Sequence, residues 1–244
     1  MHIEIMVSTS AGKTTLAKKM VFSGMNKGEF VSLSDDFVLE KSHLGWVRND
    51  FLRRRIVEII ALVICLNHLN KYKDFLQFVF HEGKSSPGSW IYKVNRMRNV
   101  IRKIGVFEFI SKRAAYGQVV LADNEGLLQG VHNLFVHQNG GSDLTKISRY
   151  VDLVPLPDVV LYLQQDEDVL VSRTLERGHA RIKADAPENV VNFIHQAVKV
   201  FNELAQIPKV QERLIIVDDG MNFTSQDEGA ITNEFNRVVN LVHS

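Results

Sequence analysis

The chain has 244 residues, 45% of them hydrophobic, which suffices for one α/β domain with a substantial core. Its 29 basic and 28 acidic residues leave a formal net charge of +1, so charge does not favour a nucleic-acid backbone or an anionic membrane as a partner. The single cysteine, Cys65, excludes an internal disulfide.

The sequence also lacks the pattern of a membrane span. The strongest apolar run, residues 56–66, is about half as long as a bilayer requires and contains Glu58. The first residues enter a strand pattern directly, without the charged and apolar regions of a secretory signal. We therefore expect a cytoplasmic protein that has neither a membrane nor a nucleic acid as partner.

The first expected element is a strand over residues 2–7, which runs into a loop of small residues and then into a helix. Triphosphate binding requires inward-facing backbone N–H groups, a helix N-terminus behind them, a lysine over the outer phosphates and a hydroxyl for Mg²⁺. Gly12, Lys13 and Thr14 supply the glycine, the lysine and the hydroxyl in that order. The segment therefore predicts a phosphate-binding loop.

Two positions depart from the usual G-x-x-x-x-G-K-[ST] pattern of such loops. Val7 occupies the place of the first glycine, and Ser10 stands where many kinases carry another glycine. A Cβ at position 7 limits how closely the backbone can approach a bound phosphate. The alternative interpretation is that the segment merely begins a helix, with Lys13 solvated on its first turn.

The helix after the loop is expected over residues 13–23, ending at Gly24, and a second strand over residues 30–33 precedes Asp35 and Asp36. A βαβ unit of this kind predicts a parallel sheet with a right-handed crossover. Both aspartates then lie at the carboxyl end of a strand. Their alternative role is to cap the next helix.

Helical periodicity dominates the middle of the chain, over residues 49–80 and 90–113, within a helical section of about 41–115. Three more apolar strands are expected, over residues 118–122, 158–163 and 213–217. Five short strands separated by helices predict a three-layer α/β/α sandwich with a parallel sheet, in a single domain over residues 1–244.

In such sheets ligands gather at the carboxyl ends of the strands. Asp123 and Glu125 follow the third strand and so fall on the same edge as the phosphate loop. Asp123 is a candidate Mg²⁺ ligand through water, and its alternative is turn chemistry before Gly126. Glu125 and Asp36 are rival candidates for a catalytic base at this edge.

Taken in order, the chain resembles the P-loop kinases of nucleosides and nucleotides, and within them the thymidylate kinase and deoxynucleoside kinase group. The resemblance rests on the loop at residues 7–15, the acidic pair, the segment 119–129, and the stretch 157–181. That last stretch contains the strand Pro-Asp-Val-Val-Leu-Tyr-Leu followed by an R-x-x-x-R pattern. The family fold implies the strand order 2-3-1-4-5.

The resemblance also implies roles for individual residues. Lys13 would hold the outer phosphates, Thr14 would bind Mg²⁺, and Asp35 or Asp36 would contact the acceptor. A lid over about residues 173–186 would neutralise the transferring phosphoryl group. The expected catalytic residues are Lys13, Asp36, Arg173 and Arg177. The expected nucleotide-binding residues are Ser10, Ala11, Gly12, Lys13, Thr14, Thr15 and Arg181.

The lid arginines have a plainer alternative, in which Glu176 and the acidic residues 166–168 pair with them on a solvated helix. The favoured function is an ATP- and Mg²⁺-dependent kinase of a small-molecule acceptor, a nucleoside or a nucleoside monophosphate. The alternatives are a nucleotide-binding module that transfers nothing, and a kinase of a sugar or antibiotic hydroxyl. The resemblance further implies a homodimer formed through helices such as residues 49–80.

Overall fold

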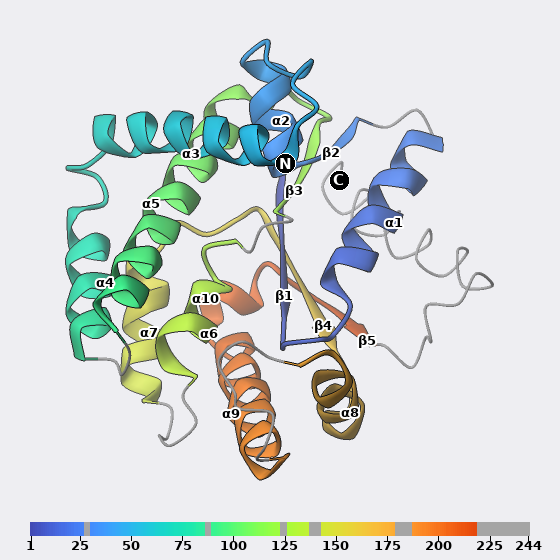
Figure 1. Ribbon diagram of the computed structural model, residues 1–244, viewed down its shortest axis with the longest axis vertical. Helices are drawn as coiled ribbons and strands as arrows, with labels where there is room; N and C mark the ends of the chain where they lie inside the picture. Colours follow the sequence, from blue (N-terminus) through green and yellow to red (C-terminus); the bar gives the residue numbers. More distant parts are fainter. Residues whose placement is uncertain (27–29, 86–88, 123–125, 137–142, 179–186, 219–244) are drawn as a thin grey trace.

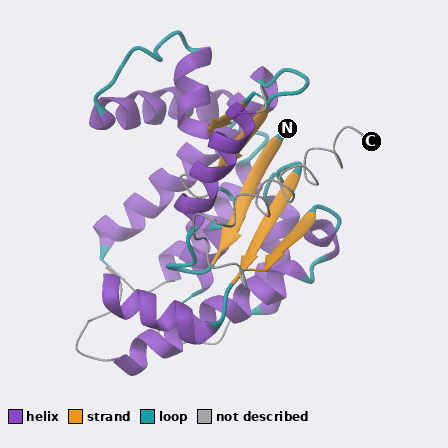
Figure 2. Cartoon of the chain, turned by 90° about the vertical axis from the view of Figure 1, so that its right-hand side faces the viewer, coloured by secondary structure: helices purple, strands orange, loops and turns teal. Residues whose placement is uncertain are grey.

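The computed structural model describes residues 1–26, 30–85, 89–122, 126–136, 143–178 and 187–218. Five parallel strands form one sheet in the order β2-β3-β1-β4-β5, which confirms the expected fold class and strand order. Figure 2 shows strands of this sheet running side by side in one direction. The strands are β1 His2–Val7, β2 Val31–Leu33, β3 Val119–Ala122, β4 Val159–Gln164 and β5 Leu214–Asp218.

Helices cover both faces of the sheet, with α1 on one side of the strands and α5 and α7 on the other (Figure 1). None of the helices in the described ranges is long and apolar enough to cross a membrane. The helices are α1 Lys13–Asn26, α2 Ser34–Lys41, α3 Asp50–Asn67, α4 Lys73–Ser85, α5 Trp90–Arg113, α6 Gly130–Phe135, α7 Leu144–Leu153, α8 Glu167–Arg177, α9 Pro187–Ala205 and α10 Pro208–Gln211.

The structure corrects one expected helix end and rules out one alternative role at another helix end. Helix α1 continues through Gly24 to Asn26, because a glycine inside a helix weakens it without necessarily ending it. Helix α2 begins directly after β2, and its N-cap residue is Leu33, which has no side chain able to accept a hydrogen bond. Asp35 and Asp36 therefore lie within the first turn and do not cap the helix.

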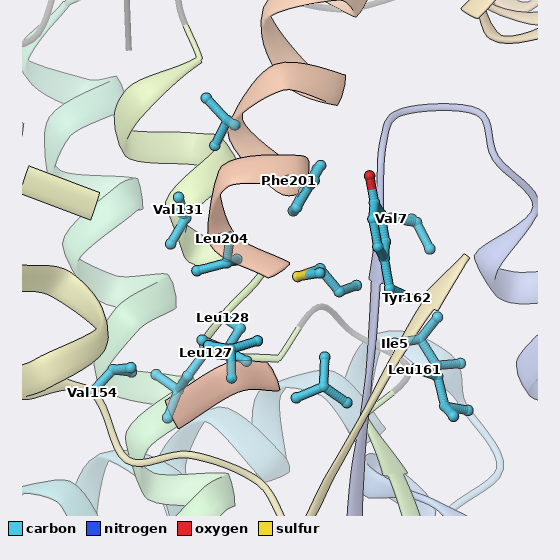
Figure 3. Packing of buried hydrophobic residues seen from close by; sticks show 14 of the residues in the cluster. Ile5, Val7, Leu127, Leu128, Val131, Val154, Leu161, Tyr162, Phe201 and Leu204 are labelled. Atoms are coloured by element: carbon cyan, nitrogen blue, oxygen red, sulfur yellow. The ribbon is translucent and has the colours of Figure 1, made fainter. Parts of the chain in front are cut away.

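The core is built on the central strand β1, whose six residues are all buried. Both of its faces are covered by helices, which explains why apolar residues lie on both faces, with Ile3, Ile5 and Val7 on one and Met6 on the other. Figure 3 shows Ile5 and Val7 of β1 with Leu161 of β4, and α9 contributes Phe201 and Leu204 to the same cluster. This packing holds the carboxyl end of β1, where the glycine-containing loop begins.

One acidic side chain is buried in this apolar strand. Glu4 is 1% exposed, and its Oε1 accepts a hydrogen bond of 2.8 Å from the backbone N–H of Gln129. A Cβ at Gly126 would lie 1.9 Å from the carboxyl carbon of Glu4, so the chain after β3 passes directly against this carboxyl group. Burial raises the pKa of Glu4 to about 7, and the Gln129 hydrogen bond and the charges of Lys103 and Lys13 oppose that rise.

Helices α3 and α5 cross at very close range. A Cβ at Gly105 in α5 would lie 2.0 Å from the carbonyl oxygen of Ala61 in α3. Gly105 therefore allows the two backbones to approach. Gly83 in α4 has no atom within 4 Å of the corresponding Cβ position and provides a matched comparison.

We expect Gly105→Ala to lower the free energy of unfolding by about 1–3 kcal/mol, because overpacking outweighs the better helix propensity of alanine. Gly83→Ala is expected to leave the free energy of unfolding unchanged or to raise it by up to about 1 kcal/mol. Urea denaturation of both variants measures these changes. Equal effects at the two positions would contradict the close crossing of α3 and α5.

The buried Glu4 predicts a pH-dependent stability. Its folded pKa of about 7 lies above its ordinary value of 4.5, so its contribution is complete below pH 4.5 and is lost as the pH rises through about 7. The unfolding free energy of Glu4→Gln relative to the wild type should therefore increase by about 3 kcal/mol from pH 4.5 to above pH 7. Urea denaturation at several pH values measures this difference.

His2 has the opposite dependence, because burial lowers its pKa to about 4. Its contribution is present above pH 6.5 and is lost as the pH falls through about 4. Since His2 is present in both the wild type and Glu4→Gln, its effect cancels in the difference between their unfolding free energies. A difference between Glu4→Gln and the wild type that does not change with pH would contradict the assignment to Glu4.

Candidate active site

The candidate site begins where β1 extends beyond its neighbour. Pairing of β1 with β3 ends at Glu4 opposite Ala122, whereas pairing with β4 continues to Val7 opposite Leu163. Beyond the end of β3, the side-chain amide of Gln129 forms the backbone hydrogen bonds that a neighbouring strand would form with Val7. Its Oε1 accepts from the Val7 N–H at 3.0 Å, and its Nε2 donates to the Val7 carbonyl at 2.8 Å. This pair fixes the point from which the loop departs.

The loop itself contains two residues with left-handed backbone, Ser10 at φ 65° and Gly12 at φ 91°. Left-handed residues of this kind occur in the concavities where backbone N–H groups bind anions. A Cβ at Gly12 would meet no atom within 4 Å, so glycine is favoured there by its backbone angle and not by crowding. Helix α1 begins directly after Gly12, and its N-terminal N–H groups favour a negative ligand.

The side chains of the loop connect it to two helices. Thr9 Oγ1 lies 3.4 Å from Nε2 of His132 in α6, and the Thr174 hydroxyl in α8 donates to Ser10 Oγ at 3.1 Å. The Ser8 hydroxyl is buried and has no hydrogen-bond partner among the described residues. An unpartnered buried donor in such a loop fits a phosphate-bearing ligand, whose oxygens accept hydrogen bonds.

Lys13 is the first residue of α1 and is partly buried, and its charge acts on the carboxyl group of Glu4. Thr14 and Thr15 follow on the first turn with exposed side chains, whereas Ala11 is buried in the core. The loop thus places one ammonium group and two accessible hydroxyl groups at the N-terminus of α1. These are the parts that the sequence predicts for a phosphate site.

The two acidic residues after β2 have different environments. Nη2 of Arg102 in α5 donates to both carboxylate oxygens of Asp35 at 2.6 Å, and both side chains are largely buried. Asp36 pairs with Arg53 of α3, and its side chain is 53% exposed. The helical section therefore holds both aspartates, and Asp36 is the one that remains accessible to a ligand.

Helix α8 carries the two expected lid arginines. Arg173 donates to Gln165 Oε1 at 3.1 Å, and Arg177 is the exposed last residue of the helix. Gly178, at φ 72°, follows as the C-cap residue. In the described part of the chain, neither arginine forms an ion pair with Glu176 or with residues 166–168.

Three expected site residues, Asp123, Glu125 and Arg181, lie outside the described residues, so their roles stay predictions. Conversely, Gln129 and Arg102 are not among the residues expected from the sequence, because their partners are 122 and 67 residues away. The sequence does indicate that Glu4 is unusual, because it is an acidic residue inside an apolar strand pattern.

No protein-family model and no curated protein matches the sequence. The structure is similar to that of a deoxyadenosine kinase from M. mycoides with the products dCMP and a flexible dCDP bound, with a TM-score of 0.51 at 15% identity. The match covers 97% of this chain and 100% of that chain. The same kinase with dATP bound gives a TM-score of 0.49 at 16% identity, with the same coverage.

A third structure of that kinase, with dCTP bound, gives a TM-score of 0.39 at 15% identity and again covers 97% of this chain and 100% of the other. At such identities a structural likeness establishes architecture, because many functions share one fold. The parallel sheet is expected from the sequence pattern, and its order 2-3-1-4-5 is the one that the family resemblance implies. The chain therefore has the α/β fold of the M. mycoides deoxyadenosine kinase.

Proposed function

We propose that the protein is an ATP-dependent phosphotransferase whose acceptor is a nucleoside or a nucleoside monophosphate. The observation that carries this proposal is the loop between β1 and α1, with Ser10 and Gly12 in the left-handed region and Lys13 at the helix N-terminus. The fold shared with a deoxyadenosine kinase that binds dCMP and dCDP supports the acceptor class. The proposal comprises one kinase domain with a lid over about residues 173–186.

The residues of the loop are suited to phosphoryl transfer, which requires positioning and positive charge more than covalent chemistry. The loop N–H groups and the Ser8 hydroxyl would donate to phosphate oxygens. Lys13 would move its charge from the neighbourhood of Glu4 to the outer phosphates. Arg173 and Arg177, four residues apart on α8, would face the transferring group from the same side of the helix.

The donor set at the start of α1 also fits Mg²⁺, which prefers oxygen ligands. The exposed Thr14 hydroxyl would bind the ion, and Asp123 would be the second protein ligand, through water. Mg²⁺ supplies charge neutralisation on the outer phosphates when it is bound. In this proposal Asp36, the accessible aspartate, takes the proton of the acceptor hydroxyl, and Asp35 positions α5 through Arg102.

The proposal places the enzyme in the cytoplasm, where the buried Cys65 would remain a free thiol. It also includes a homodimer formed through α3. That helix exposes several large apolar side chains, as expected of a surface that another chain covers. These side chains are Phe51, Leu52, Ile59, Leu62, Val63 and Leu66.

One observation favours a second candidate, a nucleotide-binding module that transfers nothing. Ser10 holds a left-handed backbone despite its Cβ, and its hydroxyl is bound by Thr174. A non-glycine residue in this region costs about 1–3 kcal/mol, which a competent loop would have to tolerate. Val7 adds a second side chain where the usual loop has glycine.

The decisive experiment is transfer of labelled γ-phosphate from ATP, with Mg²⁺, into pooled nucleosides, nucleoside monophosphates, sugars and aminoglycosides. We expect a labelled nucleotide product from the wild type. The rate of transfer by Lys13→Ala should be lower by about 100-fold or more, because a charge that stabilises the transition state is lost. Lys18→Ala is the matched control, since Lys18 is an exposed lysine of the same helix.

A labelled sugar or aminoglycoside would support the kinase activity but identify a different class of acceptor. ATP binding that depends on Lys13, without any labelled product, would favour the module that transfers nothing. The absence of ATP binding by the wild type would contradict both candidates.

Ser10→Gly separates the two candidates by a binding measurement. If the loop is competent, removing the Cβ should change the dissociation constant of ATP by less than about 3-fold, because the gain in backbone freedom and the lost hydrogen bond to Thr174 offset each other. Thr174→Val, which removes only the hydrogen bond, is the control. ATP binding that tightens more than about 10-fold in Ser10→Gly would identify a decayed loop.

A further inference from the structure

A cavity of about 650 Å³ lies between α3, α4 and α5, and it takes no part in the phosphate site. Figure 1 shows these helices on the opposite side of the sheet from α1. The volume falls within the range of small-molecule sites, about 300–1,000 Å³. Its walls are almost entirely apolar and include Ile59, Leu62, Val79, Phe80, Met97 and Ile101.

The charged residues around this cavity are predominantly positive. Among the described residues, five cationic side chains and one carboxylate, that of Glu58, line it. Arg102 pairs with Asp35, and Arg98 lies 3.9 Å from Glu58. The cationic residues are Lys84, Lys93, Arg96, Arg98 and Arg102. An apolar cavity whose charged lining residues are mostly cationic is complementary to a molecule that has an apolar body and a negative end.

Arg96 distinguishes this cavity from an ordinary apolar groove. It is 8% exposed, and its Nε and Nη1 are buried without a hydrogen-bond partner among the described residues. Its guanidinium lies over the ring of Tyr92, 4.9 Å from the ring centre, which supports the cation but accepts no hydrogen bond in the guanidinium plane. Buried guanidinium donors are normally satisfied by an anion such as a carboxylate.

We propose that this cavity binds an elongated apolar molecule with one carboxylate, such as a fatty-acid anion, with its chain between the three helices and its carboxylate on Arg96. A nucleotide or sugar fits the cavity poorly, because its many polar groups would be buried against apolar walls without partners. No residue of the loop over 8–14 or of α8 lines the cavity. The proposal therefore does not depend on the phosphate loop. It does share Arg102 with the contact that holds Asp35, and a homodimer through the exposed face of α3, which includes Ile59 and Leu62, would cover the cavity.

The test is a calorimetric titration of the full chain with dodecanoate below its micelle concentration, and with dodecanol as the neutral ligand of equal chain length. Trp90 lines the cavity, so its fluorescence provides a second signal. We expect Arg96→Met to weaken dodecanoate binding by about 10- to 100-fold, the loss of one or two hydrogen bonds to a charged group. Dodecanol binding should remain unchanged in that variant.

Two further variants make the test specific. Arg113→Met removes another arginine of α5 that lies over an aromatic ring, that of Phe109, and that does not line the cavity; it should bind dodecanoate as the wild type does. Gly83→Leu should abolish binding of both ligands, because Gly83 lines the cavity and has open space at its Cβ position, which the leucine side chain would fill.

Lys13→Ala must bind dodecanoate like the wild type, which separates this test from that of the kinase. The proposal is overturned if the wild type shows no saturable binding, or if Arg96→Met binds dodecanoate as tightly as the wild type. It is also overturned if the affinity for dodecanoate falls as the protein concentration rises, because a second copy of the chain would then occupy this face.

Discussion

The candidate site depends on the hydrogen-bonded pair between the Gln129 side chain and the backbone of Val7. Strand β1 extends three residues beyond the end of its pairing with β3, and this extension would otherwise leave buried backbone groups unpaired. The amide supplies one donor and one acceptor, as a neighbouring strand would. Because the pair lies at the last residue of β1, it also determines where the phosphate loop starts. Replacing it by an apolar contact would leave the Val7 N–H and carbonyl without partners.

Several of the polar groups buried in the core lie at the loop or contact it, among them Ser8, Gln129 and Thr174. Glu4 is buried in the central strand below Lys13, and the Ser8 hydroxyl is buried at the start of the loop. Burying such groups destabilises the folded chain, so their presence at one place is typical of a functional site. A side-chain hydrogen bond also connects the loop to α8, since the Thr174 hydroxyl donates to Ser10 Oγ.

The helical section between β2 and β3 serves two separate purposes in this molecule. Through Arg102 and Arg53 it holds the two aspartates that follow β2. On the same helices, apolar side chains surround a cavity lined by the buried Arg96, whose Nε and Nη1 have no hydrogen-bond partner among the described residues. The first set of contacts supports the phosphotransferase proposal, and the second supports a ligand of quite different chemistry.

By itself the sequence determined the strands, their parallel arrangement and the position of the loop, whereas the strand order followed from the family resemblance. Buried strands are short apolar runs, and the loop needs a fixed order of glycine, lysine and hydroxyl residues within a few positions. The sequence could not show that Asp35 is held by Arg102, that Gln129 completes β1, or that Arg96 is buried beside a cavity. These contacts join residues that are far apart in the chain, so only the packing of the helices on the sheet decides them.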